Sequence, residues 1–146
     1  MKKITLLVEM LFATLSIGQN IKIVEIDADQ TSTDDMEFLE ILTESSNQSL
    51  NGYIVVFYNG NSDQSYRTLD LTGFSSDSNG YFIIGSDLFP GADIIMGPDN
   101  TIQNGADAIA IYSADAANFP DGTSVTSSCL VDAAVSYTHL TLPTKA

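Results

Sequence analysis

The sequence of 146 residues has very little histidine, cysteine, tryptophan or positive charge. Its single histidine, His139, lies close to the C-terminus, and it has no tryptophan. For residues 1–138 the lack of histidine excludes a Ser-His-Asp arrangement, histidine acid–base catalysis and most zinc sites. The single cysteine, Cys129, cannot form an intrachain disulfide, and we expect it to be a small buried side chain on a strand.

Positive charge is equally scarce. Five lysines and arginines stand against 19 aspartates and glutamates, which gives a formal net charge of −14 at pH 7. Between residues 19 and 134 the only basic residues are Lys22 and Arg67, whereas every acidic residue except Glu9 lies there. A field of this sign repels phosphate backbones and acidic membrane surfaces. The composition therefore argues against nucleic-acid binding; it keeps an exported domain soluble and would attract divalent cations or basic partners.

The longest apolar segment is at the N-terminus. Two lysines precede residues 4–17, which are largely apolar, and small residues up to Gly18 permit cleavage before Gln19. The segment is too short to span a membrane, and it is interrupted by Glu9. We therefore expect residues 1–18 to be a signal peptide, and the protein to be secreted, extracellular or attached to the cell surface.

The sequence pattern of residues 135–144, near the C-terminus, differs from that of the rest of the chain. Residues 135–144 resemble the translated end of a sequencing adapter, and the competing interpretation is an ordinary strand rich in Thr and Leu. On the first interpretation residues 135–146 are artefactual and the natural protein continues beyond Ala134. The domain then spans residues 19–134 and lacks its last strand or strands.

The segment from 19 to 134 shows no helical periodicity over three or more turns. Short apolar runs alternate with clusters of Asn, Gly, Asp and Ser, which is typical of a β-sandwich or barrel. The Asn-Gly pairs favour turns between antiparallel strands. The apolar run of residues 54–57 predicts a central strand. We expect a long loop over residues 85–105 with one short edge strand, and room for one helical turn before Pro120. The expected strands cover residues 21–26, 37–42, 53–58, 68–71, 81–84, 94–96, 108–112 and 130–134.

The first two expected strands carry a family pattern. Ile23-Val24-Glu25-Ile26-Asp27-Ala28-Asp29 is followed by Glu37-Phe38-Leu39-Glu40-Ile41. The later matching segments are residues 47–53, 56–60, 79–82 and 103–112. In this order the segments resemble the bacterial lamin-tail domain, an immunoglobulin-like β-sandwich that is usually a non-catalytic module of secreted proteins. The chain departs from the family at Val24, where an Asn is frequent.

The resemblance covers most of residues 20–134 and implies an all-β, immunoglobulin-like antiparallel β-sandwich. It also implies that Glu25 and Glu40 accept backbone or hydroxyl hydrogen bonds near the rim of the sandwich. Relatives occur beside secreted nucleases, phosphatases and other hydrolases, and in surface proteins, so the resemblance specifies no ligand. The motif residues that it marks as structural are Glu25, Glu37, Phe38, Glu40, Asn104, Gly105 and Asp107.

The acidic segment after the first strand is a candidate metal site. Asp27, Asp29 and Asp34 are candidate ligands of Ca²⁺, a cation that prefers several oxygen ligands, although their spacing matches no known calcium loop. The first two also form an Asp-x-Asp motif like that of nucleotide-sugar transferases. That activity needs parallel strands and crossover helices, which the sequence does not predict. We expect a solvated acidic loop and no cofactor.

Paired carboxylates suggest a second kind of site. Glu25, Glu37 and Glu40 would supply the carboxylates of a glycoside hydrolase, because cross-strand neighbours lie within a few ångström. Such a site also needs a cleft with aromatic side chains that stack on sugars, and the aromatic residues mostly lie within the apolar strands. We therefore expect no catalytic residues in this chain.

The sequence thus predicts a non-catalytic secreted or cell-surface module that binds, attaches or positions. Its expected partner is an unidentified protein or surface ligand, without nucleic acid, a membrane span or an intrachain disulfide. Two alternatives stay open. One is the N-terminal accessory domain of a secreted hydrolase, of nuclease or phosphatase type, whose catalytic part lies beyond the truncation. The other is a calcium-stabilised adhesion module.

Overall fold

The computed structural model describes residues 21–28, 36–98 and 101–135. Within these ranges the chain forms eight strands and a 3-10 helix, η1, and no helix there has the length and apolarity to cross a membrane. The expected signal peptide and residues 136–146 lie outside the described residues. The elements are β1 (Ile21–Asp27), β2 (Phe38–Thr43), β3 (Tyr53–Asn59), β4 (Gln64–Asp70), β5 (Tyr81–Gly85), β6 (Ile94–Ile95), β7 (Ala108–Ser113), η1 (Ala116–Asn118) and β8 (Leu130–Val135).

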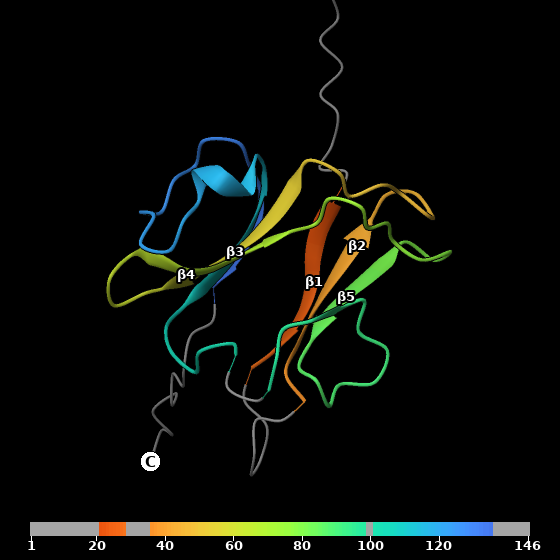
Figure 1. The fold of residues 1–146 in the computed structure, drawn as a ribbon, viewed down its shortest axis with the longest axis horizontal. Helices are drawn as coiled ribbons and strands as arrows, with labels where there is room; N and C mark the ends of the chain where they lie inside the picture. The colour runs from red at the N-terminus through yellow and green to blue at the C-terminus, as the bar shows by residue number, and fades with distance from the viewer. Residues whose placement is uncertain (1–20, 29–35, 99–100, 136–146) are drawn as a thin grey trace, which may run out of the picture.

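The strands form two four-stranded sheets on opposite sides of a shared core (Figure 1). The first sheet has the order β1-β2-β5-β6 and the second has the order β4-β3-β7-β8. Every pair is antiparallel except β5–β6, which is parallel. The prediction of an all-β, immunoglobulin-like sandwich is therefore confirmed.

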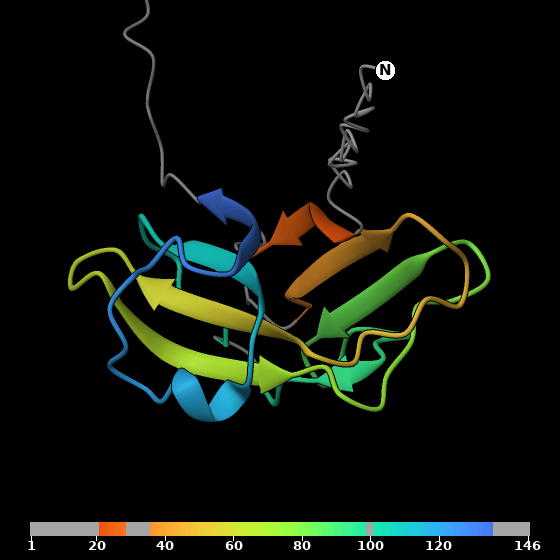
Figure 2. The ribbon, with the colours of Figure 1, turned by 90° about the horizontal axis from the view of Figure 1, so that it is seen from above.

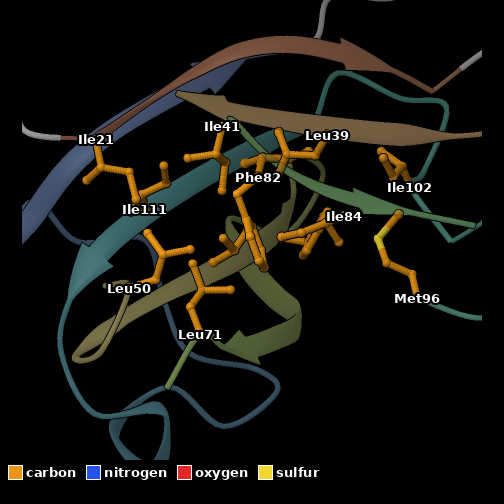
Figure 3. Packing of buried hydrophobic residues seen from close by; sticks show 13 residues of the cluster. Ile21, Leu39, Ile41, Leu50, Leu71, Phe82, Ile84, Met96, Ile102 and Ile111 are labelled. Carbon is orange, nitrogen blue, oxygen red and sulfur yellow. The ribbon is translucent and has the colours of Figure 1, made fainter. Parts of the chain in front are cut away.

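The core forms because alternate residues of the strands are apolar. In β2, Leu39, Ile41 and Thr43 are buried, whereas the residues between them are half-buried. This period of two turns one face of the sheet towards the other sheet. Figure 3 shows the resulting packing. The buried cluster consists of Ile21, Leu39, Ile41, Leu50, Val55, Phe57, Leu71, Phe82, Ile84, Met96, Ile102, Ile109 and Ile111.

The strand β3 is buried on both faces. Val55 and Phe57 pack in the core between the sheets. The alternate residues face the opposite way, into a second apolar cluster that includes residues beside η1. The prediction of a central strand over residues 54–57 is confirmed, since β3 pairs with both β4 and β7. The second cluster consists of Ile54, Val56, Tyr58, Ala110, Tyr112 and Phe119.

One side of the sandwich is closed by contact between β1 and β8, which are edge strands of different sheets (Figure 2). The backbone N–H of Ile23 donates a hydrogen bond to the Asp132 carboxylate (2.8 Å). An edge strand exposes unpaired backbone groups that invite aggregation. The side chain of Asp132 satisfies one of these groups and joins the two sheets.

Two expectations about local structure need correction. The fourth strand begins at Gln64 rather than at residue 68, because its polar first residues pair with β3 beyond a register shift at Phe57/Tyr58. Cys129 is not a buried strand residue: it is exposed and its φ is 60°. A backbone in the left-handed region does not continue a strand, so β8 begins one residue later. The helical turn before Pro120 is present as η1.

Candidate functional site

Glu37, which directly precedes β2, is fully buried. Its Oε2 accepts hydrogen bonds from the backbone N–H of Thr101 (2.7 Å) and from the Thr101 hydroxyl (2.9 Å). The N–H of Ile102 donates to the same carboxylate at 3.3 Å. A buried charge is tolerated only when such donors surround it. Glu37 therefore fastens the segment before β7 to the first sheet and places Ile102 in the core.

Glu25 and Glu40 lie directly opposite each other on β1 and β2. Glu25 is exposed and Glu40 is half-buried. Burial raises the pKa of the Glu40 carboxyl, and the negative charges of Glu25 and Asp77 raise it further. Glu37 lies on the core side of β2 with Leu39, so the structure divides the three candidate glutamates between two faces.

Phe38, the other motif residue of this strand, lies on the outer face of the first sheet. Its ring contacts that of Phe89, with ring centroids 4.5 Å apart. Gly85 is opposite Phe38 in the ladder, and a Cβ there would be 2.9 Å from the Cβ of Phe89. The small residue thus lets the chain after β5 fold back onto β2.

Asp107 directly precedes β7 and is only 6% exposed. Its Oδ1 accepts a hydrogen bond from the backbone N–H of Gly60 (2.8 Å). The backbones approach so closely here that a Cβ on Gly60 would lie 1.7 Å from the carbonyl oxygen of Ala106. Asp107 therefore joins the end of β3 to the start of β7, and the position of Gly60 requires glycine.

Two Asn-Gly segments meet at this corner. The side-chain amide of Asn59 donates a hydrogen bond to the side-chain oxygen of Gln103 (2.7 Å). Asn104 is exposed, and a Cβ on Gly105 would be 3.2 Å from Oδ2 of Asp107. The resemblance marked Asn104, Gly105 and Asp107 as structural motif residues, whereas it included Asn59 and Gly60 in the matching segment 56–60 without giving them a role. The same Asn-Gly pair occurs at residues 59–60 and 104–105, and this repetition could have indicated that Asn59 and Gly60 belong to the same site.

The second oxygen of Asp107, Oδ2, is buried and has no hydrogen-bond partner among the described residues. A buried polar atom without a partner costs about 1–3 kcal/mol, and more when it is charged. Asp107 is also one of the residues that line a pocket of about 310 Å³. Two aspartates and several apolar side chains are among the lining residues. Its lining includes Tyr58, Asn59, Gly60, Asp63, Asp107 and Val125.

A second pocket, of about 440 Å³, lies near the start of β8. Phe119, Thr126 and Cys129 line it, and Cys129 Sγ is 3.9 Å from the hydroxyl oxygen of Ser128. A thiolate is the reactive form of cysteine, and cations or helix N-termini favour it. The lining contains no Lys, Arg or His.

The candidate calcium ligands are only partly described. Asp27 ends β1 and is half-buried, whereas Asp29 and Asp34 lie outside the described residues. Within residues 21–28, 36–98 and 101–135, no three His, Cys, Asp or Glu side chains are grouped so that they could hold a metal ion. The calcium hypothesis therefore stays a prediction from the sequence.

No protein-family model matches the chain, and no curated protein matches it. The resemblance to the lamin-tail domain therefore stays a prediction that rests on the order of the sequence segments. The structure adds the two-sheet, all-β fold to it.

Proposed function

We propose that the chain is a non-catalytic β-sandwich module of a secreted or cell-surface protein, and that it binds, attaches or positions a partner. The environment of Glu37 supports this best. A catalytic acid or base must come within hydrogen-bond reach of its substrate. Glu37 is instead fully buried, and Thr101 and Ile102 occupy its carboxylate. The Glu37 carboxylate therefore has a structural role, because its hydrogen bonds go to the protein's own backbone and to the Thr101 hydroxyl.

The charge of the domain supports a binding role. Arg67 is one of two basic residues between positions 19 and 134, and its guanidinium donates to the backbone carbonyl of Met96 (3.0 Å). Acidic side chains dominate the charged groups that remain. A surface of one sign accelerates encounter with a partner of opposite sign and discourages partners of like sign. A basic partner therefore fits the module best.

Export is tested by expression of the full chain in a bacterial host that has a secretion pathway. We expect the protein outside the cytoplasm, with Gln19 as its new N-terminus. A protein that stays in the cytoplasm and keeps Met1 would contradict the secreted part of the proposal. The matched control replaces Lys2 and Lys3 by Gln, which removes the basic region that a signal peptide needs.

The non-catalytic part is tested with the purified chain and chromogenic phosphate ester, nuclease and glycoside substrates. We expect no turnover above buffer. Turnover that co-purifies with the chain and disappears in Glu25→Gln or Glu40→Gln, but not in Glu44→Gln, would overturn the proposal. For binding, labelled protein is incubated with intact bacterial cells, where we expect saturable retention that weakens as salt rises. Absence of saturable retention would count against it.

The alternative of an accessory domain is tested at the gene. Sequencing of uncut genomic DNA across codon 134 shows whether the codons for residues 135–144 belong to the locus. A downstream catalytic domain would favour the accessory-domain alternative. A sorting or anchoring segment would favour the surface module.

A further inference from the structure

The outer face of the first sheet, where β1, β2 and β5 lie side by side (Figure 1), is rich in apolar side chains. The residues of β2 and β5 that alternate with the core residues point outward, and they include Phe38, Leu42, Tyr81 and Ile83. In an antiparallel sheet with one solvated face, the outward residues are usually polar. The exposed Ile95 of β6 extends the same face, because the register places it in one row with Phe38.

The two outer faces of the sandwich differ in how far the chain covers them. On the second sheet, Phe119 from the segment after β7 belongs to the apolar cluster of the outer face. On the first sheet, the segment after β5 folds back over one end, where Phe89 contacts Phe38. Beyond this contact Tyr81 is still 38% exposed and Ile95 54% exposed. Exposed apolar side chains that gather next to polar ones are typical of an interaction site.

Negative charge lies along one side of the same face. The register places Glu25 of β1 opposite Glu40 of β2, and Asp27 opposite Phe38. Residues directly opposite each other in a ladder point to the same face of the sheet. Glu40 in turn is opposite Ile83 of β5. The face therefore has an acidic strip, which consists of Glu25, Asp27 and Glu40, and beside it an apolar strip, which consists of Tyr81, Ile83 and Ile95.

The surroundings of Glu40 favour a cation over the acidic strip. Burial raises the pKa of the Glu40 carboxyl, and the negative charges of Glu25 and Asp77 raise it further. A positive side chain above Glu40 would offset this repulsion, and it would act more strongly where Ile83 helps to exclude water. A metal ion does not fit, because no three His, Cys, Asp or Glu side chains in the described ranges are grouped so that they could hold one.

A second copy of the chain does not complement this face. In a twofold dimer the same patch meets itself, so the acidic strips of the two copies would add their negative charges. Lys22, opposite Leu42, is the single basic residue in the four strands of the first sheet. One lysine does not balance three carboxylates. An anionic lipid surface is repelled for the same reason.

We propose that the outer face of the first sheet binds a basic amphipathic segment of a partner protein. Lysine or arginine side chains of that segment lie over the acidic strip, and its apolar side chains cover the apolar strip. The aliphatic stem of a lysine or arginine can rest on apolar surface while its charged end reaches a carboxylate. The inference rests on the proposed function, to which it adds the docking surface and the chemistry of the partner.

The first test uses two peptides and the NMR shifts of the backbone amides of the full chain. One peptide is an amphipathic helix of about 18 residues built from leucine and arginine, and the other has the same composition in scrambled order. We expect saturable shifts at Glu40, Leu42 and Ile83 with the amphipathic peptide, and binding at least about tenfold weaker with the scrambled one. Equal binding of the two peptides, or shifts confined to the second sheet, would overturn the inference.

Two serine substitutions test the apolar strip. Ile95→Ser removes an apolar side chain from the strip, and Val125→Ser removes one from the segment before β8, with matched exposures of 54% and 55%. Both side chains are exposed, so both variants should fold. We expect Ile95→Ser to weaken binding of the amphipathic peptide by about tenfold, and Val125→Ser to leave it unchanged. Equal effects of the two substitutions would show that the peptide does not use this face.

Two further substitutions each remove one negative charge. Glu25→Gln lies in the acidic strip, and Asp121→Asn lies in the segment before β8; both positions are exposed. We expect Glu25→Gln to weaken peptide binding at low salt by about fivefold, and Asp121→Asn to leave it unchanged. Equal effects of the two, whether losses or none, would mean attraction by overall charge and would overturn the inference.

The other occupants are tested by sedimentation equilibrium and by vesicles of phosphatidylcholine and phosphatidylglycerol. A dimer that Ile95→Ser dissociates, or vesicle binding that Ile95→Ser abolishes, would assign the face to a second copy or to a membrane and would overturn the inference. If the amphipathic peptide does not bind but the chain is still retained on cells, only the docking surface is wrong. If the chain shows turnover that depends on its own carboxylates, the proposed function is wrong whatever the peptide does.

Discussion

The hydroxyl of Tyr58 donates a hydrogen bond to the hydroxyl of Tyr112 (3.0 Å), which in turn donates to the backbone carbonyl of Thr126 (2.9 Å). Both tyrosines are buried on the outer face of the second sheet, and Phe119 packs against Tyr112 with ring centroids 4.7 Å apart. The outer face of a sandwich usually meets water. Here the segment after β7 covers it, so this segment belongs to the folded core.

The first prediction concerns the Tyr112 hydroxyl, which lies between the Tyr58 hydroxyl and the Thr126 carbonyl in this chain of hydrogen bonds. Tyr112→Phe leaves the buried hydroxyl of Tyr58 without its acceptor, and we expect a loss of about 1–3 kcal/mol in the free energy of unfolding. Urea denaturation followed by circular dichroism measures it. The control is Tyr53→Phe, at a half-buried position at the start of β3, where we expect a change within about 0.5 kcal/mol. Equal losses would contradict the role of the buried pair.

The second prediction concerns alkaline pH. Burial raises the pKa of Tyr58 above its ordinary value, and the hydrogen bond with Tyr112 raises it further. Above about pH 10 the unfolded chain releases the Tyr58 proton while the folded chain keeps it, so folding stability is present below that pH and falls as the pH rises. We expect the free energy of unfolding to decrease as the pH rises above about pH 10, and to decrease less in Tyr58→Phe. Identical slopes in the two proteins would contradict the raised pKa.

The third prediction concerns Glu37. In Glu37→Gln an amide replaces one carboxylate oxygen, so one N–H or hydroxyl of the segment before β7 loses its acceptor. We expect a loss of about 2–3 kcal/mol in the free energy of unfolding. Glu44→Gln, at an exposed position, is the control, with an expected change within about 0.5 kcal/mol. Denaturation curves at neutral pH measure both, and a tolerated Glu37→Gln would remove the main support for a structural motif.

The fourth prediction addresses calcium. Because we expect the acidic segment after β1 to be a solvated loop, the melting curve should be the same in millimolar Ca²⁺ and in chelator. A calcium-stabilised module would instead gain about 2.7 kcal/mol at a calcium concentration 100-fold above its dissociation constant. Differential scanning calorimetry distinguishes the two, with Mg²⁺ at equal ionic strength as the control. A rise specific to Ca²⁺ would favour the adhesion alternative.

The strands could be predicted from the sequence because their signal is local. An apolar run such as residues 54–57, bounded by turn residues, fixes a buried strand without knowledge of its neighbours. The start of β4 was missed since Gln64 and Ser65 are polar, and only their pairing with β3 makes them strand residues. Cys129 was wrongly predicted to be a buried strand residue, because the amino-acid composition around it does not reveal its left-handed backbone conformation.

The candidate site could be predicted only in part, since its contacts join distant residues. Asp107 was marked by the resemblance, but its bond to Gly60 spans 47 positions in the sequence. The bonds from Thr101 to Glu37 span 64 positions. No periodicity encodes such partners. The hydrogen bonds that join Asp107 to Gly60 and Glu37 to Thr101 therefore emerge only from the folded chain.

The last prediction concerns the outer pair Glu25 and Glu40. Because burial and the nearby carboxylates raise the pKa of Glu40 in the folded state, the folded chain holds this proton more tightly than the unfolded chain. The favourable contribution of the protonated Glu40 carboxyl to folding stability is therefore present at low pH, and it is lost as the pH rises through the folded-state pKa. We expect Glu40→Gln, which cannot ionise, to melt at a higher temperature than the natural chain at pH 7. The difference should shrink below about pH 4, where the carboxyl is protonated in both states. Glu44→Gln provides the matched control on an exposed carboxylate, and a lower melting temperature for Glu40→Gln at pH 7 would show that Glu40 has a favourable partner which outweighs Glu25.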